Sequence, residues 1–416
     1  MAQRGTPRRL RAAVRRYVPE LVELRRELHR HPELSWQEER TQGVVLERLK
    51  AWGLEDARPI ARTGATALVK GEGRRARRRG TRGKGRGTRG GPTLLWRADM
   101  DALPVQEENE SEYRSTVANV MHACGHDGHM AIALTLARVV HEGRSELPGN
   151  VRFVFQPAEE TAGGARSCID DGVMDKPKVD AVLGLHIDAD TPVGALNVLP
   201  GPVWAAPTGF RLVITGRSGH GGLPQQTVDA IAVAAQVISA LQTVVSRSMN
   251  PQRAVVLTVG TIQGGTKGNI IAGEVDMTGT IRTFEERTLE RVLRRAEEIV
   301  RGVTSGMGAE YRFEHVTPCP PAVNDEGMAG LVREVGAEFF GAERLVGTRT
   351  TGADDMAMFL AKAPGCYFRL GGRNEERDIR YPHHHPRFDF DEEALGLGVE
   401  FGLRLIEAYL GRGGVS

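Results

Sequence analysis

The chain has 416 residues, of which 40% are hydrophobic, 26% charged and only 5% aromatic. This length is enough for two or three domains with a buried core, so a minimal binding module is excluded. The composition predicts a globular chain rather than a fibrous or disordered one. The shortage of aromatic side chains argues against a surface that stacks nucleobases.

The net charge of +2 hides an uneven distribution: nine positive charges fall between residues 73 and 91, so the rest of the chain is net acidic. Residues 73–91 consist almost only of Gly, Arg, Thr, Lys and Ala, which is too polar a composition to fold by itself. We expect a solvated insert that forms an extended hairpin loop between two strands. The alternative, an electrostatic arm for nucleic acid or another anionic surface, is disfavoured because no aromatic residue interleaves with the charges.

The four cysteines, Cys124, Cys168, Cys319 and Cys366, are too few and too widely spaced for a disulfide framework. A reducing compartment, by default the cytoplasm, is therefore expected. No apolar run reaches the roughly 18 residues that a membrane span needs, and residues 1–16 lack the apolar segment of a secretory signal. We interpret that arginine-rich start as part of a solvated helix, with a transit peptide as the alternative.

The first 200 residues alternate predicted helices and strands. Leu21, Leu24 and Leu28 recur at helical spacing, and the helix that they form should stop at His31-Pro32. Short apolar segments predict buried strands at 66–69, 93–96, 151–155 and 181–185, and longer periodic segments predict helices at 41–52 and 130–140. This alternation predicts an α/β sheet covered on both faces, with sites at the ends of its strands.

The pattern changes near residue 206. Strands are predicted at 210–215, 254–261, 274–282 and 310–316, with helices at 228–246 and 285–304. That order, β–α–β–β–α–β, is the split unit of ferredoxin-like folds. Beyond it a helix at 328–340, a strand at 365–370 and a helix at 395–410 restore the mixed character. We therefore expect an α/β domain of residues 1–205 and 317–416, interrupted by an α+β domain of residues 206–316.

Candidate metal-binding and acidic groups gather where the predicted strands end. The segment His122-Ala-Cys-Gly-His-Asp-Gly-His129 packs three imidazoles, a thiol and a carboxylate into eight residues. Glu159 and Glu160 follow one strand, His186 closes another, and a run of three histidines begins at His383. Each group alone is a weak signal, because a lone histidine or a glutamate pair is more often structural or solvated. Together they supply the nitrogen, sulfur and oxygen donors that a divalent ion such as zinc or manganese requires.

The order of these motifs resembles that of the M20 metallopeptidase family, and within it the amidohydrolase branch of N-acyl-amino-acid amidohydrolases, hippurate hydrolases and auxin-conjugate hydrolases. The matching segments are 26–33, 97–104, 122–129, 155–160, 184–186, 219–220, 264–269, 279–283 and 384–388. The resemblance implies a metal-dependent aminopeptidase-like α/β catalytic domain with an inserted ferredoxin-like domain that serves as a lid and dimerises.

The resemblance also implies roles at the metal centre. Cys124, His126, Glu160, His186 and His384 match the family's ligands for a pair of divalent ions, such as zinc, manganese or cobalt. Glu159 matches its general base, which would take a proton from an activated water and pass it to the leaving amine.

Four further residues match supporting positions. Asp101 matches a carboxylate that orients an imidazole ligand, with a simple turn residue as the alternative. His220 matches a histidine of the inserted domain that stabilises the developing oxyanion, usually across a dimer. Asn269 and Arg282 match substrate-side positions more loosely, and each could equally be structural.

The resulting hypothesis is a hydrolase that cleaves the amide bond of N-acyl amino acids or related small N-acyl amines with metal-activated water. The alternatives within the superfamily are an N-carbamoyl-amino-acid hydrolase and a small dipeptidase. A non-catalytic homologue that binds a metal or ligand is the alternative of a different class. A homodimer through the inserted domain is implied, and neither nucleic acid nor a membrane is expected as a partner.

Overall fold

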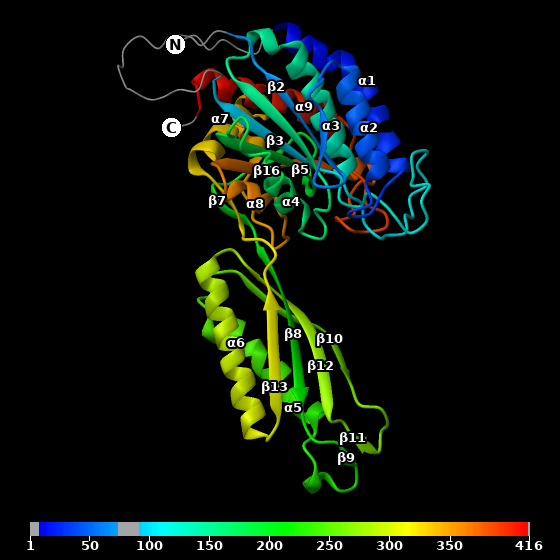
Figure 1. Cartoon of the computed structure of the whole chain (residues 1–416), viewed down its shortest axis with the longest axis vertical. Helices are drawn as coiled ribbons and strands as arrows, with labels where there is room; N and C mark the ends of the chain where they lie inside the picture. The colour runs from blue at the N-terminus through cyan, green and yellow to red at the C-terminus, as the bar shows by residue number, and fades with distance from the viewer. Residues whose placement is uncertain (1–7, 74–90, 415–416) are drawn as a thin grey trace, which may run out of the picture. The chain divides into compact units, whose positions relative to one another are not determined.

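A computed structural model describes residues 8–73 and 91–414. The chain forms two compact units (Figure 1). The first unit contains Met1–Gly201, Val323–Thr348 and Asp355–Ser416, and the second contains Pro202–Ala322 and Arg349–Asp354. The second unit therefore takes in a short segment, 349–354, that the sequence analysis assigned to the α/β domain.

The first unit is built on a mixed eight-stranded sheet, in the order β1-β2-β4-β3-β5-β16-β6-β15. Its strands are β1 (Arg58–Ile60), β2 (Gly64–Lys70), β3 (Thr93–Asp99), β4 (Asn150–Gln156), β5 (Ala181–Pro192), β6 (Leu196–Asn197), β15 (Leu345–Val346) and β16 (Gly365–Arg373). The central strands β4, β3, β5 and β16 run parallel to one another. Parallel strands need covered faces, because their connections cross over the sheet.

Seven helices of the described residues supply that cover. They are α1 (Arg8–Arg30), α2 (Glu39–Ala51), α3 (His126–Glu142), α4 (Gly164–Asp170), α7 (Glu326–Phe340), α8 (Met356–Leu360) and α9 (Glu393–Arg412). Leu21, Leu24 and Leu28 of α1 are buried, and the helix ends directly before His31-Pro32, as expected.

Alternate residues of β3 show that helices lie on both faces of this sheet. Trp96 belongs to the large core, and a Cβ added at Gly402 of α9 would lie 2.9 Å from its ring. Arg97, the next residue, pairs instead with Asp355, the residue directly before α8. Figure 1 shows α4 and α8 near this face. The sheet thus carries an apolar core on one side and a buried polar network on the other.

Two details of this sheet differ from what the sequence predicts, and both predictions were wrong. The expected hairpin around residues 73–91 is absent from the described strands, because β4 lies between β2 and β3 in the sheet; residues 74–90 themselves lie outside the described residues. His186 does not close its strand. β5 continues to Pro192, since its pairing with β16 extends that far.

The second unit has the expected order of elements, β8-α5-β10-β12-α6-β13. These are β8 (Ala206–Thr215), α5 (Ala230–Thr243), β10 (Val255–Gly264), β12 (Glu274–Thr283), α6 (Glu286–Gly306) and β13 (Glu310–Val316). The strands form an antiparallel sheet in the order β10-β12-β8-β13. Both helices pack on it around a separate apolar core that includes Leu212, Val237 and Val292.

Four short strands complete the description. Two of them, β9 (Gly219–His220) and β11 (Ile270–Ile271), pair antiparallel within the second unit. The other two, β7 (Gly201–Trp204) and β14 (Ala322–Asn324), lie where the chain passes between the units.

One helix among the described residues, Ala230–Ser248, is long and apolar enough to cross a membrane by length and composition. The segment is not an uninterrupted apolar run, because it contains Gln236, Gln242 and Arg247. The side chains of Val233, Val237, Leu241 and Val244 from this helix are buried in the core of the second unit.

Candidate functional site

The site begins where the parallel neighbours β3 and β4 end side by side, with Asp99 opposite Gln156. Just beyond β3, the buried carboxylate of Asp101 accepts the backbone N–H groups of Glu159 and Glu160, each at 3.0 Å. It also accepts the hydroxyl of Ser35 at 2.6 Å. Burial raises the pKa of Asp101, but hydrogen bonds from His126 and Ser35 outweigh it and bring the pKa below its usual value. Asp101 thus holds the turn that carries the two glutamates.

The backbone is left-handed at three positions around this site. Ala158, directly before Glu159, has φ of 49°, and His384 has φ of 68°. Gly125, between Cys124 and His126, has φ of 85° and caps the start of α3. Such angles are unfavourable for residues other than glycine and tend to persist where the surrounding structure imposes them, often at functional sites.

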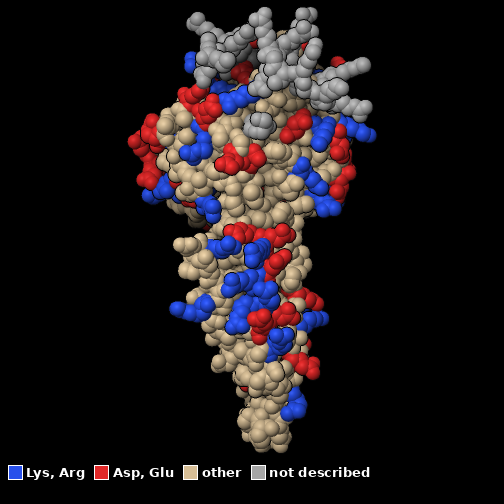
Figure 2. Space-filling model, turned by 90° about the vertical axis from the view of Figure 1, so that its left-hand side faces the viewer, with Lys and Arg blue, Asp and Glu red and all other residues tan. Residues whose placement is uncertain are grey.

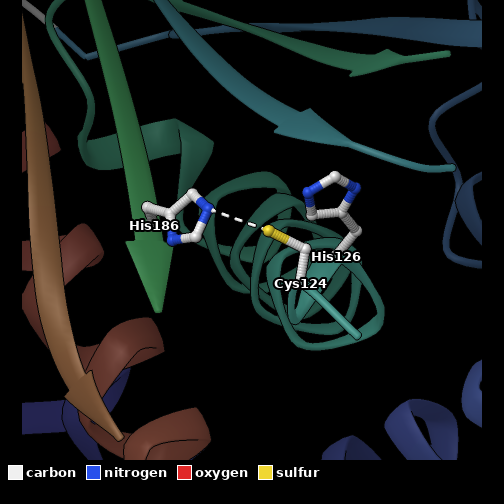
Figure 3. A group of neighbouring side chains, drawn as sticks. All are labelled: Cys124, His126 and His186. Atoms are coloured by element: carbon white, nitrogen blue, oxygen red, sulfur yellow. Dashed lines mark hydrogen bonds between the residues drawn. The ribbon is translucent and has the colours of Figure 1, made fainter. Parts of the chain in front are cut away.

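Cys124, His126 and His186 come together from the start of α3 and from β5 (Figure 3). The Sγ atom of Cys124 lies 3.6 Å from Nε2 of His186. Two ligands of a tetrahedral zinc ion, with bonds of about 2.0–2.3 Å, are separated by roughly 3.4–3.6 Å. The spacing of these donors therefore suits one metal ion between them.

The ring of His126 is oriented by its other nitrogen. Nδ1 donates to the backbone carbonyl of Asp101 at 2.9 Å, so Nε2 is left to face the site. Nε2 is buried, and among the described residues it has no hydrogen-bond partner. It lies 3.9 Å from Oε1 of Glu160 and 4.0 Å from Oε2 of Glu159. Oδ2 of Asp99 lies nearer, at 3.7 Å. An unpartnered imidazole nitrogen beside three carboxylates is the arrangement that a cation completes.

The charge balance of the site supports the same conclusion. Burial lowers the pKa of His126, but Asp99, Asp101 and Glu160 more than compensate and raise it to about 10. The carboxylates therefore create a surplus of negative charge that favours a positive group at this position.

A second set of donors joins the first through Cys124. Cys124, Glu160 and His384 offer ligand atoms within 4.8 Å of one another. Nε2 of His384 lies 3.6 Å from Oε1 of Glu160. Since Cys124 belongs to both sets, the five residues that the sequence analysis singled out as metal ligands form one continuous cluster. The donors suit a pair of divalent ions.

The remaining predicted residues lie in the second unit. His220 on β9 is opposite Ile270, and the backbone N–H of Gly221 donates to the carbonyl of Asn269, so His220 and Asn269 are neighbours. Nδ1 of His220 accepts the N–H of Gly222 at 2.9 Å, which leaves Nε2 as the donor of the ring. Arg282 lies apart from them on β12, where burial lowers its pKa.

Sequence reasoning missed a layer of buried residues behind the cluster. Asp99 bonds to His129 at 2.6 Å and to Arg97 at 2.6 Å. His29 and Arg25 both bond to Asp127, the residue after His126. The spacing of these residues could have pointed to them. In a strand, Asp99 and Asp101 are two residues apart and so face the same side, and in a helix His129 follows His126 by nearly one turn.

Comparisons with known proteins agree with this geometry. The model of the family described as peptidase family M20/M25/M40 matches residues 95–408. An N-acyl-L-amino acid amidohydrolase of Geobacillus stearothermophilus is 42% identical over 311 residues, which cover 74% of this chain and 79% of the relative. An N-acetylcysteine deacetylase of Bacillus subtilis is 36% identical, and the match covers 92% of this chain and 94% of the relative.

A solved structure is similar over nearly the whole chain. The YXEP protein of Bacillus subtilis, described as a dinuclear metal binding peptidase from the M20 family, superimposes with a TM-score of 0.79. It is 32% identical, and the match covers 94% of this chain and 98% of that one.

Proposed function

This chain belongs to peptidase family M20/M25/M40, and from that premise we propose that it is a metal-dependent amidohydrolase that releases the acyl group from N-acyl amino acids. The amidohydrolase and deacetylase relatives support this substrate class. The observation that carries the proposal is the cluster of Cys124, His126, Glu160, His186 and His384 next to the glutamate Glu159.

The donor set favours zinc among the divalent ions. A thiolate and three imidazoles are ligands that zinc prefers, while the carboxylate also accommodates manganese or cobalt. When bound, two such ions would lower the pKa of water and polarise an amide carbonyl.

Glu159 acts as the general base of the reaction. Its backbone is held by Asp101, and its Oε2 lies 4.0 Å from the ligand nitrogen of His126, so its carboxylate lies beside the donor cluster. The carboxylate takes a proton from the attacking water and passes it to the nitrogen of the leaving amine as the C–N bond breaks. Glu160 next to it serves as a ligand, so the adjacent pair divides the two tasks.

His220 supplies a hydrogen bond to the oxyanion that forms on the substrate. The Nδ1 bond to Gly222 fixes Nε2 as the donor, which is what such a role requires. Asn269, its neighbour, and Arg282 contact the substrate. These assignments make the second unit a lid.

The same unit forms a homodimer with a second copy of the chain. β10 is an edge strand of its sheet, and Ile262 on that strand is 52% exposed. Ile231, Ile270 and Leu223 are exposed apolar residues of the same unit. The end of the unit that carries β9 and β11 in Figure 1 shows few charged side chains in Figure 2. An edge strand with exposed apolar side chains favours pairing with another strand.

The protein works in the cytoplasm. The four cysteines are too few and too widely spaced for a disulfide framework, which is the usage expected in a reducing compartment.

The test is amine release from N-acetyl, N-benzoyl and N-carbamoyl amino acids and from dipeptides. Protein stripped of metal is compared with protein reconstituted with zinc, manganese or cobalt. Release confined to reconstituted protein and to acyl substrates is the expected result. Release only from N-carbamoyl substrates or dipeptides would contradict the substrate class. If folded, metal-loaded protein released no amine from any substrate of the panel, that result would contradict catalysis of this kind.

A further inference from the structure

His129 is a buried histidine of α3 that none of the proposed catalytic steps uses. Its ring makes two hydrogen bonds, one to each of two strands of the sheet. Nε2 accepts the backbone N–H of Ile187 on β5 at 2.8 Å. Nδ1 bonds to Oδ1 of Asp99 on β3 at 2.6 Å.

These two bonds determine which nitrogen of His129 carries the proton. A backbone N–H can only donate, so Nε2 must be the unprotonated acceptor and the proton must lie on Nδ1. That proton is donated to the carboxylate of Asp99. Asp99 is held in turn by Arg97, whose Nη1 lies 2.6 Å from its second oxygen.

The position of Ile187 explains why a side chain is needed here. β3 pairs with β5 from Leu94 opposite Ala181 to Arg97 opposite Gly184, whereas β16 pairs with β5 further along, through Ile187. The backbone N–H of Ile187 therefore lies beyond the last residue pair that β5 forms with β3. His129 supplies the acceptor that a neighbouring strand would have provided, because a buried N–H without a partner is costly.

Ile187 connects this bond to the metal-binding cluster. Its carbonyl accepts Nδ1–H of His186 at 2.5 Å. That bond turns Nε2 of His186 toward Cys124, at 3.6 Å. Hydrogen bonds on either side of Ile187, joined by its covalent backbone, therefore link Asp99 and His129 to the ring of His186.

We propose that His129 is a positioning residue, which fixes β5 at Ile187 and thereby aims the ring of His186, and that Asp99 sets the tautomer this requires. The role rests on the proposed function, because it presumes that His186 binds metal. Residues that orient ligands in this indirect way typically change metal affinity by about 10–100-fold when replaced.

Three substitutions of His129 test its two hydrogen bonds separately. His129→Gln keeps an acceptor at the distal position, where Nε2 meets Ile187. His129→Asn keeps a donor at the proximal position, where Nδ1 meets Asp99, but loses the acceptor. His129→Leu loses both. The matched control is His141→Leu, the same change near the other end of α3, where the ring is only partly buried.

Zinc affinity is measured by competition with a chromophoric chelator, and thermal unfolding of the metal-free variants shows that each is folded. We expect His129→Leu and His129→Asn to lose about 10–100-fold in affinity. His129→Gln and the control should stay within about 3-fold of wild type. Equal losses in the Gln and Asn variants, or none in the Leu variant, would overturn the proposal.

A second measurement tests the arrangement without any metal. Nitrogen-15 NMR of the metal-free wild-type protein should show the ring of His129 as the neutral tautomer protonated at Nδ1. Protonation at Nε2 in a protein that binds zinc would overturn the positioning role and leave the proposed function intact. A folded wild-type protein that binds no divalent ion would refute the proposed metal centre, and the positioning role with it.

Discussion

At the scale of single residues, the site combines groups whose protonation is set by their neighbours. His29 illustrates this directly behind the proposed metal ligands. It lies between Asp127, at 2.8 Å, and Glu107, at 3.3 Å. Burial lowers its pKa, but these carboxylates outweigh the effect and raise it to about 9. The histidine is therefore charged in the folded protein across the physiological range.

The first prediction concerns the pH dependence of stability. A pKa raised in the folded state stabilises the protein fully below the unfolded value near 6.5, and this contribution is lost as the pH rises through about 9. The shift corresponds to at most roughly 3 kcal/mol. Denaturant unfolding of wild type should show this decline between pH 6.5 and 9.5, and His29→Asn should lack it. Parallel pH profiles of the two proteins would contradict the assignment.

The second prediction concerns Glu159, the proposed general base. Glu159→Gln retains the backbone hydrogen bond to Asp101 and the volume of the side chain, but cannot accept the proton. Turnover of an N-acyl amino acid should fall by about 10²–10⁴-fold. Metal content, measured by elemental analysis, should stay at the wild-type level. Glu146→Gln, an exposed glutamate, is the control. Unchanged turnover, or loss of the metal, would show that Glu159 has another role.

At the scale of elements, α1 is tied to the segments that carry the proposed metal ligands. Arg25 of α1 is fully buried and bonds to Asp127 at 2.7 Å, directly after His126, and to Asp389 at 2.8 Å, five residues after His384. Its guanidinium also lies over the rings of Tyr113 and Phe390. One side chain thus joins α1 to the start of α3 and to the loop that precedes α9.

The third prediction follows from that junction. Arg25→Met removes the guanidinium from the buried carboxylate of Asp127, which keeps its bond to His29. Breaking a buried ion pair in this way costs about 3–5 kcal/mol. The midpoint of denaturant unfolding should fall accordingly. The double variant Arg25→Met with Asp127→Asn should recover part of the loss, because the buried charge is removed with its partner. A double variant whose loss is the sum of the two single losses would contradict the coupling.

At the scale of the whole molecule, the described residues form two apolar cores and the donor cluster of the proposed metal centre. One core belongs to the first unit and the other to the second. All five proposed metal ligands lie in the first unit. A ligand that binds only the native form stabilises the part of the protein that holds it.

The fourth prediction uses this separation. Leu212 is fully buried in the core of the second unit, and Leu212→Ala should destabilise that unit by about 2–5 kcal/mol. Hydrogen exchange should show faster opening of β8 and its neighbours, while zinc affinity stays within about 2-fold of wild type. A large loss of zinc affinity would show that the second unit contributes to the metal centre. Zinc should slow exchange in α3 and β5 of the variant as it does in wild type.

Much of this arrangement could be predicted from local sequence. Helix α1, the central strands and the β–α–β–β–α–β order follow from apolar periodicity. This periodicity is a property of each short segment and does not depend on residues far away in the chain. The clustering of Cys124 with Glu160 and His384 could be anticipated because the motifs follow predicted strands, and their resemblance to a family assigned their roles. The continuation of β5 past His186 could not, since it depends on pairing with β16, almost two hundred residues away.

The sequence by itself thus determined the elements, the family and the donor atoms of the proposed metal centre, because these depend on short segments. Only the tertiary structure decided how those donors are held. Asp101 holds the glutamate turn, Arg25 ties α1 to α3, and His129 replaces a strand beside Ile187. Each of these contacts joins residues distant in the chain through buried charges or backbone groups. Their partners are selected by the packing of the fold, which no local pattern of residues records.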